Sequence, residues 1–305
     1  SSSSFSSSSS PHQSTSIFDR SLKSKQRDWA ANQSDIDHVE YIREEVGWRV
    51  ADKVSDLTKH CENVLEIGNG MISSHIESDR VTNITLIDSS QKMLERAKRP
   101  IDPKVNFTRV LGDEESLSAV DGQQFDLVLT NMAAHWINDL PGWMRKVSRI
   151  LKPDCPLIGS MLAEDTLFEL RCSLQLAEME RLGGVCAHVS PLVRPTDVGS
   201  LLGSAGFQLV TLDSDEIEVC YPDMLHLLID LQLMGESSAT FARPLTLRRD
   251  IAIAASAIYK AMYSKNDVYP CTFRILSFIG WSDGPTTPKA AKRGSQTHSF
   301  KDLSL

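Results

Sequence analysis

The sequence predicts an α/β domain built on a parallel sheet of about seven strands with helices on both faces. Short β-branched or apolar runs recur along the chain, and most are followed by a polar or glycine-bearing turn and a stretch of helical periodicity. In addition, 305 residues with 41% hydrophobic content can bury one large core, so a single elaborated domain is expected. The expected strands are 64–67, 84–87, 105–109, 125–130, 157–161, 207–212 and 272–279.

Two segments precede the first strand. Residues 1–16 are almost all serine and contain no acid, so we expect a disordered leader. This composition suits organelle import, but a mitochondrial presequence also requires arginines, and the first is Arg20. An import leader and a simple low-complexity tail therefore both remain open. Residues 17–60 are expected to be helical, because apolar residues from Val39 to Leu57 recur at helical spacing.

Further helices are expected between and beyond the strands. Thr196 is a candidate N-cap for one of them. Two others form a helical insertion at about 222–265, before the last strand, so the sheet domain spans 61–281 and a polar tail spans 282–305. The expected helices are 91–98, 140–151, 165–181, 196–204, 224–234 and 249–263.

Composition argues against several classes of function. The net charge is −8, so the domain lacks the basic field that attracts nucleic acid. The six cysteines are scattered and never spaced as Cys-x-x-Cys, so neither a zinc ribbon nor a dithiol site is expected, and they are interpreted as reduced intracellular thiols. No apolar run approaches about 18 residues, which predicts a soluble or at most peripheral protein.

The segment from Val64 to Gly70 is an apolar strand that ends in an acid, Glu66, and a turn with two glycines, Gly68 and Gly70. Glycines let the backbone turn sharply and let a ligand approach it, and a following helix would offer free N–H groups. Asp88 ends the next strand, 22 residues after Glu66, where its carboxylate could accept both hydroxyls of a ribose. Together these features predict a nucleoside site.

A third acid, Asp113, follows the third strand and could accept from an adenine amino group. This order of strand-end acids resembles that of class I S-adenosylmethionine (SAM)-dependent methyltransferases, over roughly residues 39–161 and 196–279. The resemblance implies the methyltransferase sheet and a SAM cofactor. The residues it implies are Glu66, Gly68 and Gly70 at the methionine end, Asp88 at the ribose and Asp113 at the base.

Seven further segments carry a closer resemblance: SIFDR at 16–20, QRDWA at 26–30, HWINDLP at 135–141, DTLFELR at 165–171, DEI at 215–217, MGES at 234–237 and IGW at 279–281. Through them the chain, from Ile17 to about Leu303, resembles the mitochondrial complex I assembly factor 5 family of arginine hydroxylases. More distantly it is similar to the malonyl-carrier-protein methyltransferases of biotin synthesis.

The closer resemblance implies action on the matrix side of the mitochondrial inner membrane, early in complex I assembly. It implies hydroxylation of an arginine on an iron–sulfur subunit of that complex, which would be the partner, and peripheral association with the membrane. Two alternatives remain open. One is methyl transfer from SAM to a small molecule or acyl carrier, and the other is a non-catalytic scaffold with a degenerate cofactor site.

One position departs from the family pattern. Ile72 stands where the turn usually has a third glycine, and a β-branched side chain there would disturb the packing of a helix on the strand. Such overpacking typically costs about 1–3 kcal/mol. The sequence therefore predicts that SAM binds weakly or that the site has been abandoned.

The candidates for chemistry follow the fourth and fifth strands. Asn131 and His135 would lie at the carboxyl end of the sheet, where His135 could orient a substrate or move a proton, although a packing histidine is the plainer interpretation. Glu169, with Glu164 and Asp165, could accept a guanidinium, although acids at a helix start also simply favour the helix dipole. No metal site is expected, since the pair His75 and Glu77 has no evident partner histidine.

Overall fold

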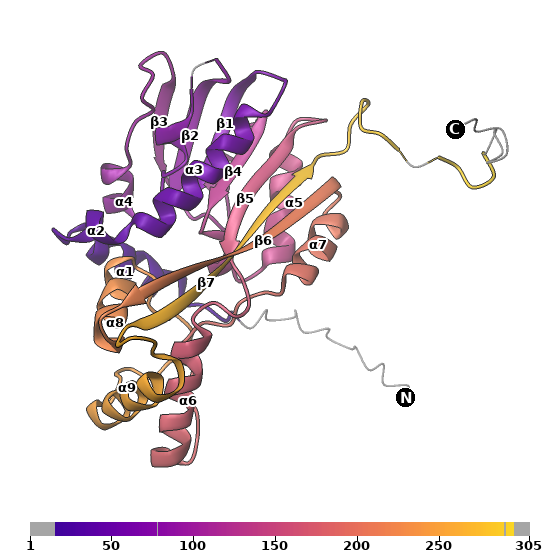
Figure 1. Ribbon diagram of the computed structural model, residues 1–305. Coiled ribbons are helices and arrows are strands. Elements are labelled where there is room, and N and C mark those ends of the chain that lie inside the picture. The colour runs from indigo at the N-terminus through magenta and orange to yellow at the C-terminus, as the bar shows by residue number, and fades with distance from the viewer. Residues whose placement is uncertain (1–15, 78, 290, 296–305) are drawn as a thin grey trace, which may run out of the picture.

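The computed structural model describes residues 16–77, 79–289 and 291–295. The leader and the end of the tail, at 1–15 and 296–305, lie outside the described residues. Seven strands form one sheet in the order β3-β2-β1-β4-β5-β7-β6, which confirms the predicted methyltransferase-type sheet (Figure 1). The strands are β1 Cys61–Gly68, β2 Val81–Asp88, β3 Asn106–Leu111, β4 Leu127–Asn131, β5 Pro156–Leu162, β6 Gln208–Tyr221 and β7 Tyr269–Trp281.

Strands β1 to β5 pair in parallel, as predicted, but β7 runs antiparallel between β5 and β6. The prediction of a wholly parallel sheet is therefore wrong at this strand. The physical reason lies in the connection. Tyr221 at the end of β6 pairs with Tyr269 at the start of β7, so the helical insertion leaves and rejoins the sheet at the same end. A strand that returns from that end must run in the opposite direction.

Helices cover both faces of the sheet, and the alternation of side chains along β4 separates them. Leu127 and Leu129 pack in a cluster with residues of α3, whereas Val128 packs in a cluster with residues of α5 and α7. Side chains buried on both faces explain why this strand is a continuous apolar run. The helices around the sheet are α1 Arg20–Ala31, α2 Ile36–Val39, α3 Tyr41–Ser55, α4 Gln91–Arg96, α5 Leu140–Ile150 and α7 Pro195–Ser204.

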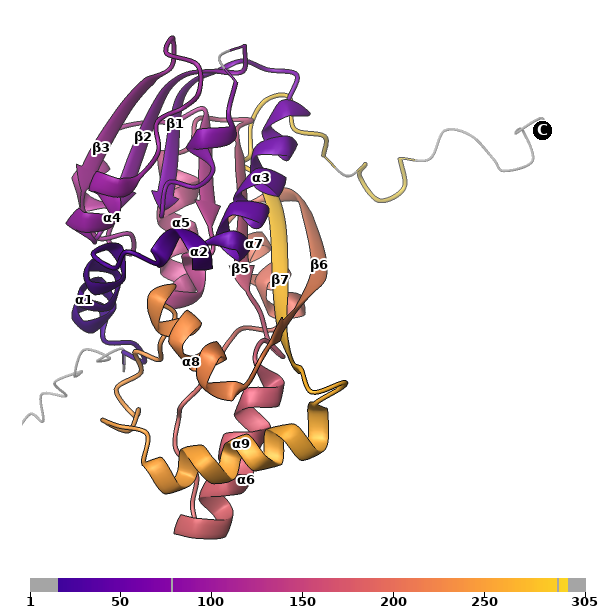
Figure 2. The same cartoon turned by 60° about the vertical axis from the view of Figure 1, so that its left-hand side comes forward.

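A second, smaller layer of helices lies beyond the carboxyl ends of the strands (Figure 2). The predicted insertion supplies α8 Met224–Leu233 and α9 Arg249–Tyr263, and α6 Phe168–Leu182 from the end of β5 packs with them. Their core joins that of the far ends of β6 and β7 in one cluster. It includes Leu170 and Leu174, Met224 and Leu231, Ile251 and Tyr259, and Phe273.

Three local expectations differ from the structure. The expected α-helix after the glycine turn is a single 3₁₀ turn, Ser73–His75, because only 12 residues, 69–80, connect β1 to β2. That length is the minimum for a parallel crossover. The helix predicted to start with Thr196 as its cap begins instead at Pro195, with Arg194 as N-cap. Proline suits the first helical position because its missing N–H has no partner there.

Strand β6 also extends well past the predicted residue 212, as far as Tyr221. Its added part is rich in acids, which favoured a loop from sequence, but these side chains are exposed on an edge strand. Charged residues on an edge protect a sheet from pairing with another chain.

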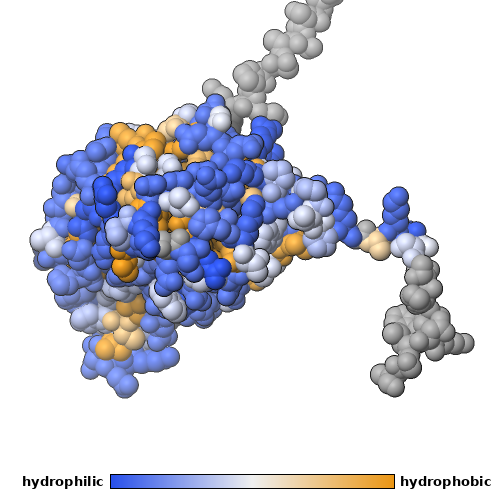
Figure 3. Space-filling view, turned by 90° about the horizontal axis from the view of Figure 1, so that it is seen from above, coloured by the Kyte–Doolittle hydropathy of each residue, from blue (hydrophilic) through white to orange (hydrophobic). Residues whose placement is uncertain are grey.

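The end of the molecule where the parallel strands start is mostly hydrophilic, and apolar side chains gather there in small separate groups (Figure 3). None of the helices within the described ranges combines the length and apolar composition that a bilayer span requires.

Candidate functional site

The carboxyl ends of β1 and β2 point toward α1 and α8 (Figure 2). Glu66, near the end of β1, is fully buried and accepts from the backbone N–H groups of Ile72 and Ser73, each at 3.0 Å, and from the Ser73 hydroxyl. Burial raises the pKa of Glu66 to about 7 in spite of these hydrogen bonds. The side chain therefore stabilises the turn by accepting from backbone N–H groups that have no other partner there.

Gly68 and Gly70 occupy backbone conformations that favour glycine, with φ of 113° and 74°. A Cβ on Gly68 would lie 2.8 Å from Cβ of Ala133, and one on Gly70 would lie 2.8 Å from Cβ of Ala97. The turn therefore lies directly against the residues that follow β4 and α4.

Ile72 is fully buried and packs in the cluster that contains Val50 of α3 and Ile84 of β2. Its side chain points toward α3 and the middle of the sheet, away from the strand ends. The third glycine of the family pattern is needed where a helix packs closely on the strand. Here a short 3₁₀ turn replaces that helix, so the β-branched side chain finds room.

Asp88 at the end of β2 is buried, and its carboxylate accepts from Ser90 N–H at 2.7 Å and from the Arg27 guanidinium of α1. Arg27 also donates to Glu114 at 2.8 Å. Burial and the neighbouring charge of Glu114 raise the pKa of Asp88 to about 6, although Arg27 acts in the opposite direction. The acid expected to hold a ribose is thus bound by the protein's own arginine.

Of the acids that follow β3, Glu114 is the buried one, whereas the predicted site residue Asp113 is half-exposed. The side chain of Asp113 is 46% exposed and binds Arg20 at 2.8 Å, whereas that of Glu114 is 3% exposed. Glu114 accepts from both Arg20 and Arg27, and their charges hold its pKa below the usual value against the effect of burial. The role of Glu114 could not be predicted from the sequence, because three consecutive acids give no signal for which one points inward.

A small polar cavity of about 10 Å³ lies between these groups, with room for about one water molecule. Three arginines, Arg20, Arg27 and Arg43, line it with Lys23, together with Asn69, Ala133, Trp136 and the acids Glu114 and Glu236. Nζ of Lys23 lies 3.2 Å from the centre of the Trp136 ring and donates to the carbonyls of Gly235 and Ser237. Side chains of α1 therefore fill the space beside the strand-end acids.

The types of residue here suit a SAM-type nucleoside, because a buried acid ends β2 and the glycine turn allows close approach. The present positions of the side chains leave no room for one, since a nucleoside needs far more space than one water molecule. A nucleoside could reach Asp88 after Arg27 has left it.

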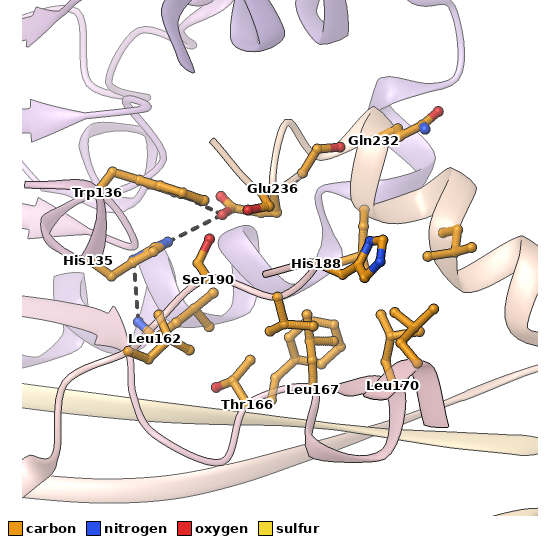
Figure 4. Close-up of a pocket in the computed structure, with 18 of the residues that line it drawn as sticks. His135, Trp136, Leu162, Thr166, Leu167, Leu170, His188, Ser190, Gln232 and Glu236 are labelled. Atoms are coloured by element: carbon orange, nitrogen blue, oxygen red, sulfur yellow. Dashed lines mark hydrogen bonds and ion pairs between the residues drawn. The ribbon is translucent and has the colours of Figure 1, made fainter. Parts of the chain in front are cut away.

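A second pocket of about 190 Å³ adjoins the first, between the sheet and the small helical layer (Figure 4). In Figure 4, His135, Trp136 and Glu236 lie at one end, and Leu167 and Leu170 lie at the other. Most of its wall is apolar, with leucines from α6 and α8 and Phe273 from β7. It can hold a largely apolar stem whose polar end reaches the acid.

Glu236 is the acid at that end and follows α8. It accepts from Arg43 Nη2 at 2.5 Å, His135 Nε2 at 3.2 Å and Trp136 Nε1 at 3.0 Å. Although burial acts in the opposite direction, His135 and Arg43 lower the pKa of Glu236 well below its usual value. Glu236 belongs to the family segment MGES, but its role could not be predicted, since nothing local in the sequence indicates that this connection folds back onto the sheet.

His135 lies where the prediction put it, beyond the end of β4, with its side chain buried. Its Nδ1 lies 3.5 Å from the Leu162 N–H, and its Nε2 faces Glu236. These two contacts, on opposite nitrogens, fix the orientation of the ring. The histidine therefore positions Glu236 at the end of the pocket.

The other predicted residues lie away from the pocket. Asn131 donates from Nδ2 to the Arg43 carbonyl at 2.9 Å and accepts from Ser160 at 3.0 Å, so it joins α3 to the sheet. Glu169 accepts from the backbone and hydroxyl of Thr272. Glu164 and Asp165 pair separately with arginines of this chain, at 3.3 and 3.6 Å.

Three comparisons place this geometry among known proteins. A family profile described as a methyltransferase domain matches residues 65–158. A Danio rerio protein named "Arginine-hydroxylase NDUFAF5, mitochondrial" is 47% identical over 97% of this chain and 92% of its own length. The Homo sapiens protein of the same name is 43% identical over 94% of this chain and 83% of its own length.

More distant similarities point to the same superfamily. A malonyl-acyl-carrier-protein O-methyltransferase of Halorhodospira halophila is 27% identical over 88% of this chain and 90% of its own length. Among solved structures, a candidate methyltransferase of Bacillus halodurans superposes with a TM-score of 0.54 at 15% identity, over 77% of this chain and 98% of that one. At that identity the match shows the fold alone.

Proposed function

The chain belongs to the NDUFAF5 family of mitochondrial arginine hydroxylases, and from this premise we propose that it hydroxylates an arginine on an iron–sulfur subunit of respiratory complex I, early in assembly. The relatives' names include the word mitochondrial. The proposed site of action is accordingly the matrix, with the protein peripheral to the inner membrane. The iron–sulfur subunit is the proposed partner, and nucleic acid is not, given the net charge of −8.

The observation that carries the proposal is the apolar pocket that ends at Glu236. An arginine side chain has an apolar stem and a cationic end, which matches leucine walls and a buried carboxylate. A carboxylate offers about four lone-pair positions, and Glu236 receives three donors from the chain. The protein's residues would bind and orient the target arginine, while an external oxidant supplies the oxygen atom.

We also propose that a SAM-type nucleoside binds beside this pocket, with its ribose at Asp88 and its methionine end at the glycine turn. The position of Asp88 at the end of β2 supports this assignment. Binding requires Arg27 to leave Asp88, so affinity would be reduced by the free energy of that ion pair. In this proposal the chain's own guanidinium, and not Ile72, is what weakens cofactor binding.

Mass spectrometry of the partner subunit tests the proposed reaction. In cells without the gene, the target arginine should lack the mass of one added oxygen atom. The wild-type chain and the control Glu164→Gln should restore it, whereas Glu236→Gln should not. Glu164 is a partly exposed acid outside the pocket, so the control has the same chemistry. A modified arginine that persists without the gene would rule out the enzymatic function.

The second candidate function is methyl transfer to a small molecule or acyl carrier. It is favoured by the methyltransferase profile over residues 65–158 and by the similarity to the malonyl-acyl-carrier-protein enzyme. SAM with a labelled methyl group, incubated with the purified protein and an acyl carrier, distinguishes the two. Label on the carrier would favour methyl transfer.

The third candidate is a scaffold without catalysis, and the α1 side chains that fill the polar cavity are the observation in its favour. Complementation with Asp88→Asn tests it. Normal complex I assembly with a folded Asp88→Asn protein that binds no nucleoside would support the scaffold, whereas failed assembly would support a cofactor-dependent role.

A further inference from the structure

A further cleft, of about 520 Å³, shares part of its wall with the apolar pocket. Gln232, Ser237 and Ser238 line both of them, and the rest of the cleft is formed by α1 and the segment 243–245. We call it the flanking cleft. A polypeptide whose arginine side chain enters the apolar pocket beside this shared wall would continue into the flanking cleft.

Helix α1 contributes different sides to the two kinds of site. Lys23 and Arg27 are buried and line the polar cavity. Another side of the helix carries residues spaced three and four apart, which therefore lie next to one another on its surface. These residues line the flanking cleft, and they are Leu22, Lys25, Gln26 and Trp29.

Two cations of the flanking cleft have no acid of their own. Lys25 is exposed, and Arg243 donates from Nη1 to the Thr240 carbonyl at 2.8 Å. Within residues 16–77, 79–289 and 291–295, neither side chain forms an ion pair with a carboxylate. The net charge of the chain is −8, so acids are available elsewhere on it in excess. The cleft therefore complements a carboxylate that comes from another molecule.

Gln26 adds an acceptor at the same place. Its Nε2 donates to the Ser238 carbonyl at 3.3 Å, whereas its Oε1 is buried and has no hydrogen-bond partner among the described residues. Buried polar atoms in folded proteins nearly always find a partner. A polypeptide backbone offers an N–H at almost every residue, whereas a lipid acyl chain offers none. This acceptor favours a polypeptide over a membrane surface as the occupant.

We propose that the flanking cleft binds the stretch of substrate polypeptide next to the target arginine and selects an acidic residue there. The inference rests on the proposed function and specifies which polypeptides the site accepts. The carboxylate would lie between Lys25 and Arg243. A neighbouring apolar side chain would cover Trp29 and Leu245, which are 48% and 93% exposed.

Fluorescence anisotropy with labelled peptides of about nine residues tests the inference. Each peptide has an arginine at its centre, and its flanking positions carry glutamate, glutamine or lysine. The wild-type protein should bind the glutamate peptide about fivefold or more tightly than the lysine peptide. Its net charge of −8 alone would favour the opposite order. Lys25→Glu combined with Arg243→Glu should reverse the wild-type order.

The matched control is Lys260→Glu combined with Lys289→Glu. It makes the same change in net charge at exposed lysines outside the cleft and should keep the wild-type order. If the wild type binds the three peptides alike, or if the variant with Lys25→Glu and Arg243→Glu keeps the wild-type order, the cleft does not select an acid.

A glutamate peptide with citrulline in place of arginine separates the inference from the function on which it rests. Citrulline has nearly the shape of arginine but no charge, so the arginine pocket requires it to bind more weakly. Weak citrulline binding without any effect of flanking charge would overturn the inference and leave the proposed function standing. Equal binding of citrulline and arginine peptides would refute the arginine pocket, and the inference with it.

Phosphatidylserine vesicles test the other occupant. If they bind the wild type but not the variant with Lys25→Glu and Arg243→Glu, and flanking charge does not affect peptide binding, the cleft contacts a membrane and the inference is wrong.

Trp29 gives a second measure that does not depend on these charges. A peptide that covers its exposed ring should shift the tryptophan emission of the protein to shorter wavelength. Trp29→Phe should remove most of that shift, whereas Trp48→Phe, at an exposed position on α3, should keep it. A shift that Trp29→Phe leaves unchanged would place the peptide elsewhere.

Discussion

The polar cavity and the apolar pocket share Trp136 and Glu236 as a wall but are stabilised in different ways. In the polar cavity, the buried acids Asp88, Glu114 and Glu236 are each held by an arginine from α1 or α3. In the apolar pocket, leucines from separate helices bury area around an open space. Removing one partner of a buried charge pair is strongly destabilising, because the other charge remains buried without compensation. Apolar walls lose only the contacts removed.

The strongest test of this difference is Arg27→Met. It leaves Asp88 and Glu114 buried without their cation, and we expect the free energy of unfolding to fall by about 3–5 kcal/mol. Urea unfolding at neutral pH measures the change. Adding Asp88→Asn should recover part of the loss, since the orphaned charge is then removed. A loss below about 1 kcal/mol would show that α1 does not dock on the strand ends.

Glu66 should make the stability of the polar region depend on pH. Burial raises its pKa from 4.5 to about 7, so the folded state binds the proton more tightly than the unfolded state does. The contribution of Glu66 to the free energy of unfolding is therefore present below pH 4.5 and is lost as the pH rises to about 7. Between pH 4.5 and about 7, the free energy of unfolding of Glu66→Gln should rise relative to that of the wild type by about 3 kcal/mol, as measured by urea unfolding. Parallel curves for the two proteins would contradict the assignment.

A truncation in the apolar pocket should cost less. Leu170→Ala removes a buried side chain that already borders an open space, so we expect a loss of about 2–3 kcal/mol, near the lower end for leucine. Its unfolding free energy should fall by the same amount at pH 5 and pH 8, unlike that of the charged variants. A pH-dependent loss would mean that the two regions are coupled.

The smallest effects concern binding. Asp88→Asn removes the buried acid at the ribose position and should weaken S-adenosylhomocysteine by about 10- to 150-fold, the equivalent of about 1.5–3 kcal/mol. Asp113→Asn, which alters a half-exposed acid, should weaken it by about threefold or less. Calorimetry compares both with the wild type. Equal effects would mean that burial does not separate the two acids.

The sequence revealed those features that depend on local pattern. Seven short β-branched or apolar runs predicted the seven strands. In β4 and β5 the run is continuous because these strands are buried on both faces. Glu66 and Asp88 could be predicted as site residues because an acid at the end of an apolar strand interrupts the apolar pattern. The length of β6 was not, because exposed edge acids look the same as a loop.

The ion pairs of the site could not be predicted, because their partners lie far apart in the sequence. Neither Arg27 nor Arg43 has a neighbour in sequence that indicates the acid it binds, and Glu236 lies about 170 residues beyond Glu66 in a connection without regular structure. Asn131 and His135 show the reverse. Their positions were predicted, but their hydrogen bonds to α3 and Glu236 emerge only from the fold.

The position of α1 has a consequence for how the chain folds. Lys23 bonds to Gly235 and Ser237, more than 200 residues away, and Asp19 N–H bonds to the carbonyl of Ala239. Closing a loop of that size costs conformational entropy before any contact forms. We expect α1 to dock late, after β7 has completed the sheet. Until then its arginines are exposed, and the acids at the strand ends are open to any other cation.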